Sequence, residues 1–489
     1  MASSMPPGPR ELVAYWGIRE PQRPAVMTRD GGITYGEAAG RATELASSLR
    51  RFGIASRVQV ALAFPNSVDY LIWLAAIFMT GAVAVPLSPN VSEAEVNQLA
   101  LSAEIGFVAC SAGARIANDP AWQPAMTDDA GNHLLRHSGP HESPALPEGA
   151  LVRHFSSGST GRPKHIVHSE AQVSQDYRQI AAVLKLDGSA RYLALAPFHH
   201  SFGAAGLYAV LAQGGVIRPV AGFIPAQVMA TARVFRPTLT LVTPPMIEML
   251  GKCHLTEPDH EVFSTLKHCV CSTGRLGATA AATFRQRFGV AVQVQYGSTE
   301  TLSATIDLNA EFQEGRVGHV YPGVEIAVFD EVGRVLPPGA TGRIGIRSRA
   351  TCTGYADEDH TLEVIDGYVL PGDKGCLDKA GALYIAGRDN VYNLGGYKVD
   401  RCEIESLIRC SLPVSYVAAM PFLRAGQPAI HVLIEADPGE VTAAGVVALC
   451  SRHLLPYKVP ARVDIRAVLP RDENGKVRMA SLVAPGTGS

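Results

Sequence analysis

A run rich in serine, glycine and threonine, FSSGSTGRPKHIVHS, occupies residues 155–169, and its small residues end at Pro163 and Lys164. Small residues let backbone N–H groups close around an anion that a lysine can neutralise. The spacing of Gly158, Gly161 and Lys164 does not fit the GxxxxGK[ST] pattern of the P-loop NTPases. A flexible linker is the alternative, but the apolar flanks oppose it. The run therefore predicts either a phosphate-binding loop of another geometry or no phosphate site at all.

Four further stretches carry residue types that could do chemistry. They are APFHHSFGAAG at 196–206, YGSTE at 296–300, GDKG at 372–375 and NGKV at 474–477. The carboxylate of Glu300 is a hard oxygen ligand of the kind that Mg2+ prefers. Taken singly, these stretches are also typical of turns, solvated lysines and core histidines without a catalytic part.

The elements that must position these stretches follow from the hydrophobic pattern. Short apolar runs alternate with helical periodicity over the first two thirds of the chain, which predicts an α/β lobe with mainly parallel sheets. The predicted strands are 58–64, 82–87, 106–110, 191–198, 238–244, 267–272 and 291–297. From about Arg316, short strands and Gly/Pro turns predict a small β-rich unit, and residues 389–489 predict a small α+β domain.

One apolar segment approaches the length that spans a bilayer. Tyr70–Leu87 is uncharged over 18 residues. Gly81 and Pro86 interrupt it, so the segment reads as a buried helix, a stop and a short strand. We therefore expect no membrane span.

Composition and charge exclude several other classes of protein. Hydrophobic residues make up 47% and charged residues 18% of the 489-residue chain, which is enough for large cores. A formal net charge of −2 provides no overall field that would recruit nucleic acid. The nine cysteines are scattered, odd in number and never spaced as CxxC, which argues against zinc and disulfides and predicts a cytoplasmic protein. Arg10 and Glu11 stand where a signal peptide would need an apolar core.

Taken together and in order, these stretches and GRDNVYNLGGYKVDRCEIE at 387–405 resemble the acyl-adenylate-forming superfamily, which includes acyl- and aryl-CoA synthetases, stand-alone adenylation enzymes and luciferases. The resemblance extends over nearly the whole chain. It implies an N-terminal adenylate-forming domain over residues 1–388 that binds ATP and the acid, with a large lobe of α/β subdomains plus the small β-rich unit. Residues 389–489 would form a small, mobile α+β C-terminal domain that carries the catalytic lysine.

The resemblance implies that the opening loop wraps the β- and γ-phosphates of ATP. The loop residues concerned are Ser156, Ser157, Gly158, Ser159, Thr160, Gly161 and Lys164. The other implied nucleotide contacts are Thr273, Gly274, Arg275, Gln295, Tyr296, Gly297, Ser298, Asp373 and Arg388. Among them the Tyr296 ring would stack on adenine and Asp373 would accept bonds from the ribose hydroxyls. Thr299 would donate to the α-phosphate and Glu300 would hold Mg2+. His165 stands where the family usually has a glycine.

The implied roles of the C-terminal domain centre on one lysine. Lys476 would bridge the acid carboxylate and the α-phosphate, because a fixed cation lowers the barrier when two anions must meet. Asp389 would be the hinge, with Asn390 as the alternative, since the run 388–396 is about one residue shorter than usual. After rotation of the domain, the residues bordering a tunnel for the thiol would be Gly395, Gly396 and Lys398.

The stretch 196–206 falls where the family builds its acid pocket. The implied acid-binding residues are His199, His200, Ser201, Gly203 and Ser303, with His200 near the reacting carboxylate. Amino-acid-activating members tend to place an aspartate in this stretch, and this chain has none there. Because an ammonium group buried without a partner would be costly, the missing negative charge predicts an uncharged acid chain.

The predicted function is ATP-dependent activation of a small carboxylic acid as acyl-AMP with release of pyrophosphate, followed by acyl transfer to a thiol, with coenzyme A as first choice. The implied catalytic residues are Lys476, Thr299, Glu300 and His200. The alternative is a stand-alone adenylation enzyme that loads the phosphopantetheine of an acyl or peptidyl carrier protein. Luciferase-like oxidation and a catalytically inactive nucleotide-binding regulator are weaker alternatives. The expected cofactors are ATP, Mg2+ and the thiol of coenzyme A or phosphopantetheine.

Overall fold

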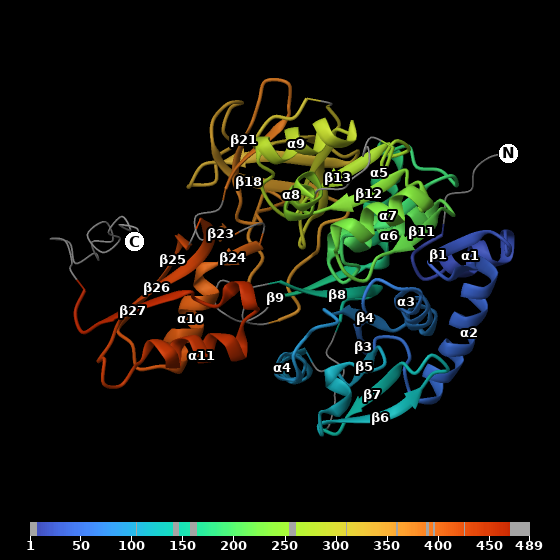
Figure 1. Ribbon diagram of the computed structural model, residues 1–489, viewed down its shortest axis with the longest axis horizontal. Coiled ribbons are helices and arrows are strands. Elements are labelled where there is room, and N and C mark those ends of the chain that lie inside the picture. Colours follow the sequence, from blue (N-terminus) through green and yellow to red (C-terminus); the bar gives the residue numbers. More distant parts are fainter. Residues whose placement is uncertain are drawn as a thin grey trace. The chain divides into compact units, whose positions relative to one another are not determined.

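The computed structural model describes residues 7–103, 105–139, 146–156, 164–253, 261–309, 311–357, 360–387, 391–394, 397–424 and 426–469. Contacts between residues divide the chain into two compact units, which Figure 1 colours from blue to orange and from orange to red. The larger unit holds the described residues up to Gly387, and the smaller unit holds those from Val391 to Leu469.

The first sheet of the larger unit has the strand order β6-β7-β5-β3-β4-β8-β9. Its strands are β3 (Gln59–Ala63), β4 (Val83–Pro86), β5 (Phe107–Cys110), β6 (Trp122–Thr127), β7 (His133–His137), β8 (Ala150–Ser156) and β9 (Lys164–Ser169). β3 is parallel to β4 and to β5, and β4 is parallel to β8, whereas β8 and β9 are antiparallel. β4 is wholly apolar, and β3 is apolar after Gln59, because both faces of a parallel sheet are covered.

The second sheet joins the four remaining predicted strands of the lobe, at 191–198, 238–244, 267–272 and 291–297, to four strands that were not predicted. These strands are β1 (Pro24–Thr28), β2 (Gly31–Thr34), β10 (Arg191–Ala194), β11 (Val216–Pro219), β12 (Leu239–Val242), β13 (His268–Cys271), β14 (Val292–Ser298) and β15 (Leu302–Asp307). Parallel pairing runs from β11 through β10, β12 and β13 to β14, and β15 then returns antiparallel to β14. The predicted α/β lobe with mainly parallel sheets is confirmed.

The predicted β-rich unit is also present and begins at Arg316. Its strands are β16 (Arg316–Val320), β17 (Val324–Phe329), β18 (Gly342–Ser348), β19 (Val364–Ile365), β20 (Tyr368–Val369), β21 (Lys374–Leu377) and β22 (Leu383–Gly387). All of their pairings with one another are antiparallel. β16 also pairs with β15, so the β-rich unit continues the second sheet.

Helices flank these sheets. They are α1 (Leu12–Arg19), α2 (Tyr35–Arg51), α3 (Val68–Thr80), α4 (Glu93–Ala103), α5 (Glu170–Val183), α6 (Ser201–Ala212), α7 (Pro225–Phe235), α8 (Pro244–Lys252) and α9 (Ala278–Phe288), with a short 3-10 helix at Arg115–Asn118. α3 begins at its N-cap Ser67 and ends at Gly81, whose φ of 86° is left-handed. It is therefore the buried helix that the sequence predicts for this segment. Among the described residues, no helix has both the length and the apolar character needed to cross a membrane.

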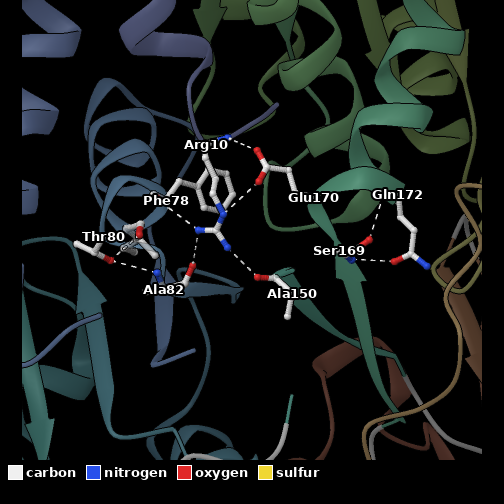
Figure 2. Close-up of polar contacts among 9 residues, drawn as sticks. Arg10, Phe78, Thr80, Ala82, Ala150, Ser169, Glu170 and Gln172 are labelled. Carbon is white, nitrogen blue, oxygen red and sulfur yellow. Dashed lines mark hydrogen bonds and ion pairs between the residues drawn. The ribbon is translucent and has the colours of Figure 1, made fainter. Parts of the chain in front are cut away.

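The start of α5 is fixed by two sets of polar contacts, which Figure 2 shows. Ser169 and Gln172 form a capping box, in which each side chain accepts a bond from the other residue's backbone N–H. Glu170 pairs with Arg10, and the Arg10 guanidinium also donates to the carbonyl groups of Phe78, Ala82 and Ala150. These contacts hold the start of α5 in place.

The smaller unit is an α+β structure, as predicted. A hairpin of β23 (Val391–Leu394) and β24 (Tyr397–Asp400) is followed by α10 (Arg401–Ser411), β25 (Tyr416–Arg424), β26 (Gln427–Glu435), α11 (Ala443–His453), a 3-10 turn at Pro456–Lys458 and β27 (Arg462–Arg466). β26 lies between antiparallel β25 and parallel β27. Ile404 and Ile408 of α10 share a core with Val432 of β26. The functions predicted for the two domains, residues 1–388 and 389–489, stay predictions.

Candidate active site

The two ends of the Ser/Gly/Thr-rich run lie on neighbouring strands. β8 and β9 place Ser156 directly opposite Lys164, so the run closes a hairpin. Residues 157–163 and the side chain of Ser156 lie outside what the structure describes. The phosphate contacts predicted for Ser156, Ser157, Gly158, Ser159, Thr160 and Gly161 therefore stay predictions.

Lys164, the first residue of β9, contacts two residues from distant parts of the chain. Its Nζ donates to the Tyr355 hydroxyl at 3.0 Å and lies 3.9 Å from Glu300 Oε1. The Tyr355 hydroxyl in turn donates to the same Glu300 oxygen at 3.0 Å. The ammonium lies 4.9 Å from the centroid of the Tyr355 ring, within the range of a cation–π attraction. The predicted phosphate lysine and the predicted metal carboxylate thus meet around one tyrosine.

Glu300 and Thr299 lie in the turn that connects β14 to β15. Ser298 and Thr301 hold this turn, because the Ser298 N–H donates to Thr301 Oγ1 at 3.2 Å and the Thr301 N–H donates back to Ser298 Oγ at 3.2 Å. Leu302 follows with a φ of 54°, a left-handed conformation that is uncommon for a residue with a side chain. The turn therefore has a defined shape, which buries Glu300 to 6% exposure. The contact predicted between Thr299 and the α-phosphate stays a prediction.

Tyr296 and Asp373 are joined directly, although 76 residues separate them in the chain. The Tyr296 hydroxyl donates to Asp373 Oδ2 at 2.8 Å, and both side chains are buried. Asp373 stands just before β21, and its carbonyl accepts a bond from Ile344 N at 2.9 Å. A carboxylate has about four lone-pair sites, so one bond from a tyrosine leaves capacity for other donors. The residues predicted to hold adenine and ribose therefore lie together.

Other predicted nucleotide residues have different surroundings. Thr273 follows β13 in a left-handed conformation with a φ of 75°, next to Gly274. The Arg275 guanidinium lies 3.0 Å from a carboxylate oxygen of Glu314, and both side chains are largely exposed. At Gly297 a Cβ atom would lie 2.0 Å from the Leu302 carbonyl oxygen, so only glycine fits there. These contacts do not test the nucleotide-binding roles of Thr273, Gly274, Arg275 and Gly297, which stay predictions.

His199 and His200 precede and cap the N-terminal end of α6, with their ring centroids 4.4 Å apart. The segment that leads into them is anchored by hydrogen bonds. The Phe198 N–H donates to Asn66 Oδ1 at 2.8 Å, and the Tyr70 hydroxyl donates to the Phe198 carbonyl at 3.0 Å. His200 is exposed, and loss of hydration nevertheless lowers its pKa. The acid-binding roles of these two residues and of Ser201, Gly203 and Ser303 stay predictions.

Two further histidines, His154 of β8 and His168 of β9, are buried with ring centroids 6.3 Å apart. Burial lowers the pKa of His154 to about 3, and the neighbouring His168 and His200 contribute to the shift. Burial likewise lowers the pKa of His168 to about 4, although the nearby Glu300 opposes this. Burial and the adjacent His200 lower the pKa of His199 to about 2. These imidazoles are therefore neutral at pH 7.

His165, which stands where the resemblance leads us to expect a glycine, packs among residues of β8 and β9. Its ring meets the Phe155 ring edge-on at 4.9 Å between centroids, and its Nδ1 contacts the guanidinium of buried Arg153. Its backbone N–H donates to Asp357 Oδ2 at 2.9 Å. These contacts hold the start of β9 in place.

Several predicted residues fall outside the described part of the chain. These are Arg388, Asp389, Gly395, Gly396 and Lys476. Lys398 lies in β24, but its side chain is not described. Their roles in ribose binding, hinge motion, the thiol tunnel and catalysis stay predictions.

Two site residues are missing from the sequence analysis. Tyr355 belongs to no stretch that the sequence singles out, and only the tertiary fold shows that it contacts both Lys164 and Glu300. Asp176 is a buried carboxylate on α5, and its Oδ1 accepts a bond from the Ser303 N–H at 2.9 Å. The sequence analysis considered only residues 196–206, whereas this carboxylate comes from the preceding helix. The expectation of an uncharged acid chain stays a prediction.

Comparisons with known proteins agree with this fold. Residues 14–356 match the family model described as AMP-binding enzyme. The 4-chlorobenzoate–CoA ligase of Arthrobacter sp. is 26% identical over 96% of this chain and 94% of its own length. The indoleacetate–CoA ligase of Aromatoleum aromaticum is 27% identical over 94% of each chain. The solved amide bond synthetase McbA of Marinactinospora thermotolerans has the same fold, with a TM-score of 0.79 at 22% identity over 97% of this chain and 99% of its own.

The fold and these relatives define an AMP-forming acid–thiol ligase. The chain belongs to the AMP-binding enzyme family, since the family model covers more than half of it. The resemblance to the acyl-adenylate-forming superfamily is thereby confirmed.

Proposed function

We propose that the protein joins a carboxylic acid to coenzyme A in two steps. The acid first attacks the α-phosphate of ATP to give acyl-AMP and pyrophosphate, and the thiol then attacks the acyl carbon and releases AMP. The observation that carries this proposal is the gathering of Lys164, Tyr355 and Glu300 from three distant segments. Two relatives are named as coenzyme A ligases of aromatic acids, so aromatic acids are the first substrates to test.

The nucleotide would lie between the two residue groups that the fold assembles. Lys164 supplies a positive charge at the end of the loop, as a phosphate chain requires. The Tyr296 and Asp373 pair offers an aromatic ring and a buried carboxylate, which suit a purine base and a ribose diol. Arg388 would assist on the ribose side.

The residues present also fit Mg2+. Among the described residues, no group of three or more His, Cys, Asp or Glu side chains gathers into a metal cage. Mg2+ is commonly bound by one or two carboxylates together with substrate phosphates, so the single carboxylate of Glu300 suits it. When bound, the ion would neutralise phosphate charge. Tyr355 and Lys164 hold the Glu300 oxygen in place by the contacts given above.

In the first half-reaction the protein must bring a carboxylate and a phosphate together. Lys476 would place its ammonium between these two anions, and Thr299 would donate to the α-phosphate. Loss of one such preorganised donor typically lowers the rate about 100- to 1000-fold. His200 is a neutral imidazole, so it would lie beside the carboxylate of the acid without adding a positive charge.

In the second half-reaction the thiol needs access to the acyl carbon. We assign the change of access to a rotation of residues 389–489 about Asp389, which withdraws Lys476. Gly395, Gly396 and Lys398 would then border the path of the thiol. Such a domain movement also protects the mixed anhydride from water.

A carrier-bound phosphopantetheine is the other possible acceptor, because it presents the same thiol. The relatives named above are coenzyme A ligases, which favours the free cofactor. A cytoplasmic location is proposed from the scattered cysteines alone. The seven cysteines whose side chains are described are all free.

The test begins with acid-dependent exchange of labelled pyrophosphate into ATP, measured over a panel of aryl, fatty and amino acids. Exchange with some acids is expected, and the best acid should then form a thioester with free coenzyme A. The enzyme could instead support exchange and load a carrier protein without forming a thioester with free coenzyme A. That result would make the carrier protein the acceptor in place of coenzyme A. No exchange with any acid would contradict the proposed function as a whole.

A further inference from the structure

A buried polar cluster lies where α5 meets β14 and β15. Asp176 and Gln179 face it from α5, one helical turn apart, and Gln295 and Ser303 face it from the two strands. Gln179 Nε2 donates to the Ser303 carbonyl at 2.8 Å and to Asp176 Oδ1 at 3.3 Å. Gln295 Nε2 donates to Ser303 Oγ at 2.9 Å, and Tyr321 donates to Gln295 Oε1 at 3.2 Å.

Asp176 is a negative charge in this cluster, and its hydrogen-bond partners in the described part of the chain are uncharged. It is 3% exposed, and burial raises the pKa of its carboxyl to about 6, while hydrogen bonds from Ser303 and Gln179 act in the opposite direction. Both of these neighbours are uncharged. At pH 7 the group is therefore mainly ionised, and a buried carboxylate of this kind is costly unless a donor or a cation meets it.

One acceptor of the cluster is left unpaired. Gln179 Nε2 donates to Asp176 and to Ser303, whereas Gln179 Oε1 has no hydrogen-bond partner among the described residues, although Gln179 is only 3% exposed. The Gln295 amide and the Tyr321 hydroxyl also donate within the cluster. A buried acceptor left unpaired costs about 1–3 kcal/mol. What the cluster lacks is a donor from outside it.

We propose that the acid substrate carries a hydrogen-bond donor, a hydroxyl or an ammonium group, which Asp176 and Gln179 recognise. This inference rests on the proposed function, because it assumes that an acid is activated beside Glu300. It assigns Asp176 and Gln179 as specificity-determining residues, in addition to Ser303.

Chain geometry places the cluster near Glu300. Ser303 is three residues after Glu300, and three residues of extended chain span at most about 10 Å. Substituted aryl and medium-chain acids are therefore the first lengths to test. α5 packs beside α6, whose N-terminal end carries His199 and His200, so the cluster and the predicted acid residues belong to neighbouring elements (Figure 1).

The test uses acids that differ only in the donor. Pyrophosphate exchange by the full-length enzyme is measured with para-hydroxybenzoate, para-methylbenzoate and para-aminomethylbenzoate, and with the corresponding phenylpropanoates. At least one donor-bearing acid is expected to exceed its methyl partner in kcat/KM by about 100-fold or more, because a site built around a hydrogen bond rejects analogues that lack it. Preference for the hydroxyl or the ammonium member identifies the group. Equal or higher activity with the methyl acids would overturn the inference and leave the cluster as a brace for the turn.

Two variants test the assignment of residues. Gln179→Leu and Asp176→Asn should reduce the preference for the donor-bearing acid at least about 10-fold while activity with the methyl acid falls less. ATP binding and the midpoint of thermal unfolding show whether each variant is folded. A fall of equal size for both acids in a folded variant would contradict the assignment. Absence of exchange with every acid in the wild-type enzyme would instead contradict the proposed function, so the two failures are distinguishable.

Discussion

The hydroxyl of Tyr296 donates a hydrogen bond to Asp373 Oδ2 at 2.8 Å, inside a core where both residues are buried. Tyr296 comes from β14 of the second sheet, and Asp373 comes from the turn before β21 of the β-rich unit. Since β16 joins these two parts of the sheet, the pair depends on the continuity of β15, β16 and β22. A bond to an ionised carboxylate is among the stronger hydrogen bonds.

The first prediction concerns recognition of ribose. Asp373→Ala removes the carboxylate and should raise KM for ATP about 100-fold, because a hydrogen-bonded diol loses its acceptor. Tyr296→Phe keeps the ring and removes one donor, so a rise of about 10-fold or less is expected. Dideoxy-ATP provides the control, since the wild type should discriminate against it and the Asp373 variant should not. Unchanged discrimination in that variant would remove Asp373 from the ribose site.

The second prediction concerns the tyrosine between Lys164 and Glu300. Tyr355→Phe removes the hydroxyl that donates to Glu300, so the ammonium can approach the carboxylate and compete with the metal. The Mg2+ concentration for half-maximal exchange should rise about 10-fold, with little change in KM for the acid. Glu300→Gln is the reference for complete loss of the charge. A Mg2+ dependence identical to wild type would show that Tyr355 is structural only.

The third prediction separates the two half-reactions. Lys476→Ala should reduce acyl-adenylate formation about 100- to 1000-fold, because the cation that joins the two anions is lost. Thiol capture of preformed acyl-AMP should change far less, because in the proposed mechanism Lys476 has been withdrawn before this step. The two rates are measured by pyrophosphate exchange and by thioester formation from synthetic acyl-AMP. A loss of equal size in both rates would argue against the proposed rotation of the C-terminal domain between the two half-reactions.

The fourth prediction concerns stability at acid pH. His154 and His168 have pKa values of about 3 and 4 in the folded protein, below the value of about 6.5 for an unfolded chain. As pH falls from about 6.5 to about 4, the unfolded chain binds these two protons and the folded protein does not. For each unit by which the pH falls in this range, the two histidines therefore lower the free energy of unfolding by about 2.7 kcal/mol.

Asp176 acts in the opposite direction over part of the same range, because its folded pKa of about 6 is raised and the folded state then binds its proton more readily. The measurement is urea unfolding of wild type and His168→Asn between pH 4.5 and 7. In the variant, the free energy of unfolding should change with pH less steeply than in the wild type. The slope should differ by about 1.4 kcal/mol per pH unit, which corresponds to the uptake of one proton. Parallel curves for the two proteins would show that His168 is already protonated in the folded state.

Much of the fold follows from local sequence. The apolar runs of 58–64, 82–87 and 238–244 are each buried strands, because a parallel sheet covered on both faces selects continuous apolar residues. Gly81 ends α3 with a left-handed φ, as its position in the sequence predicts. The continuity of the β-rich unit with the second sheet is not predicted, since the pairing of β15 with β16 depends on backbone hydrogen bonds that leave no pattern in the side chains.

The sequence by itself determined the family and the order of the motifs along the chain, and it predicts that Lys164, Glu300 and Asp373 contact a nucleotide. The tertiary structure alone decided that Tyr355 lies between Lys164 and Glu300 and that Asp176 places a negative charge beside Ser303. The physical reason is that motif spacing records neighbours along the chain. Contacts across a sheet or from a helix to a strand join residues more than 50 positions apart, and their energy depends on burial that only the packed fold creates.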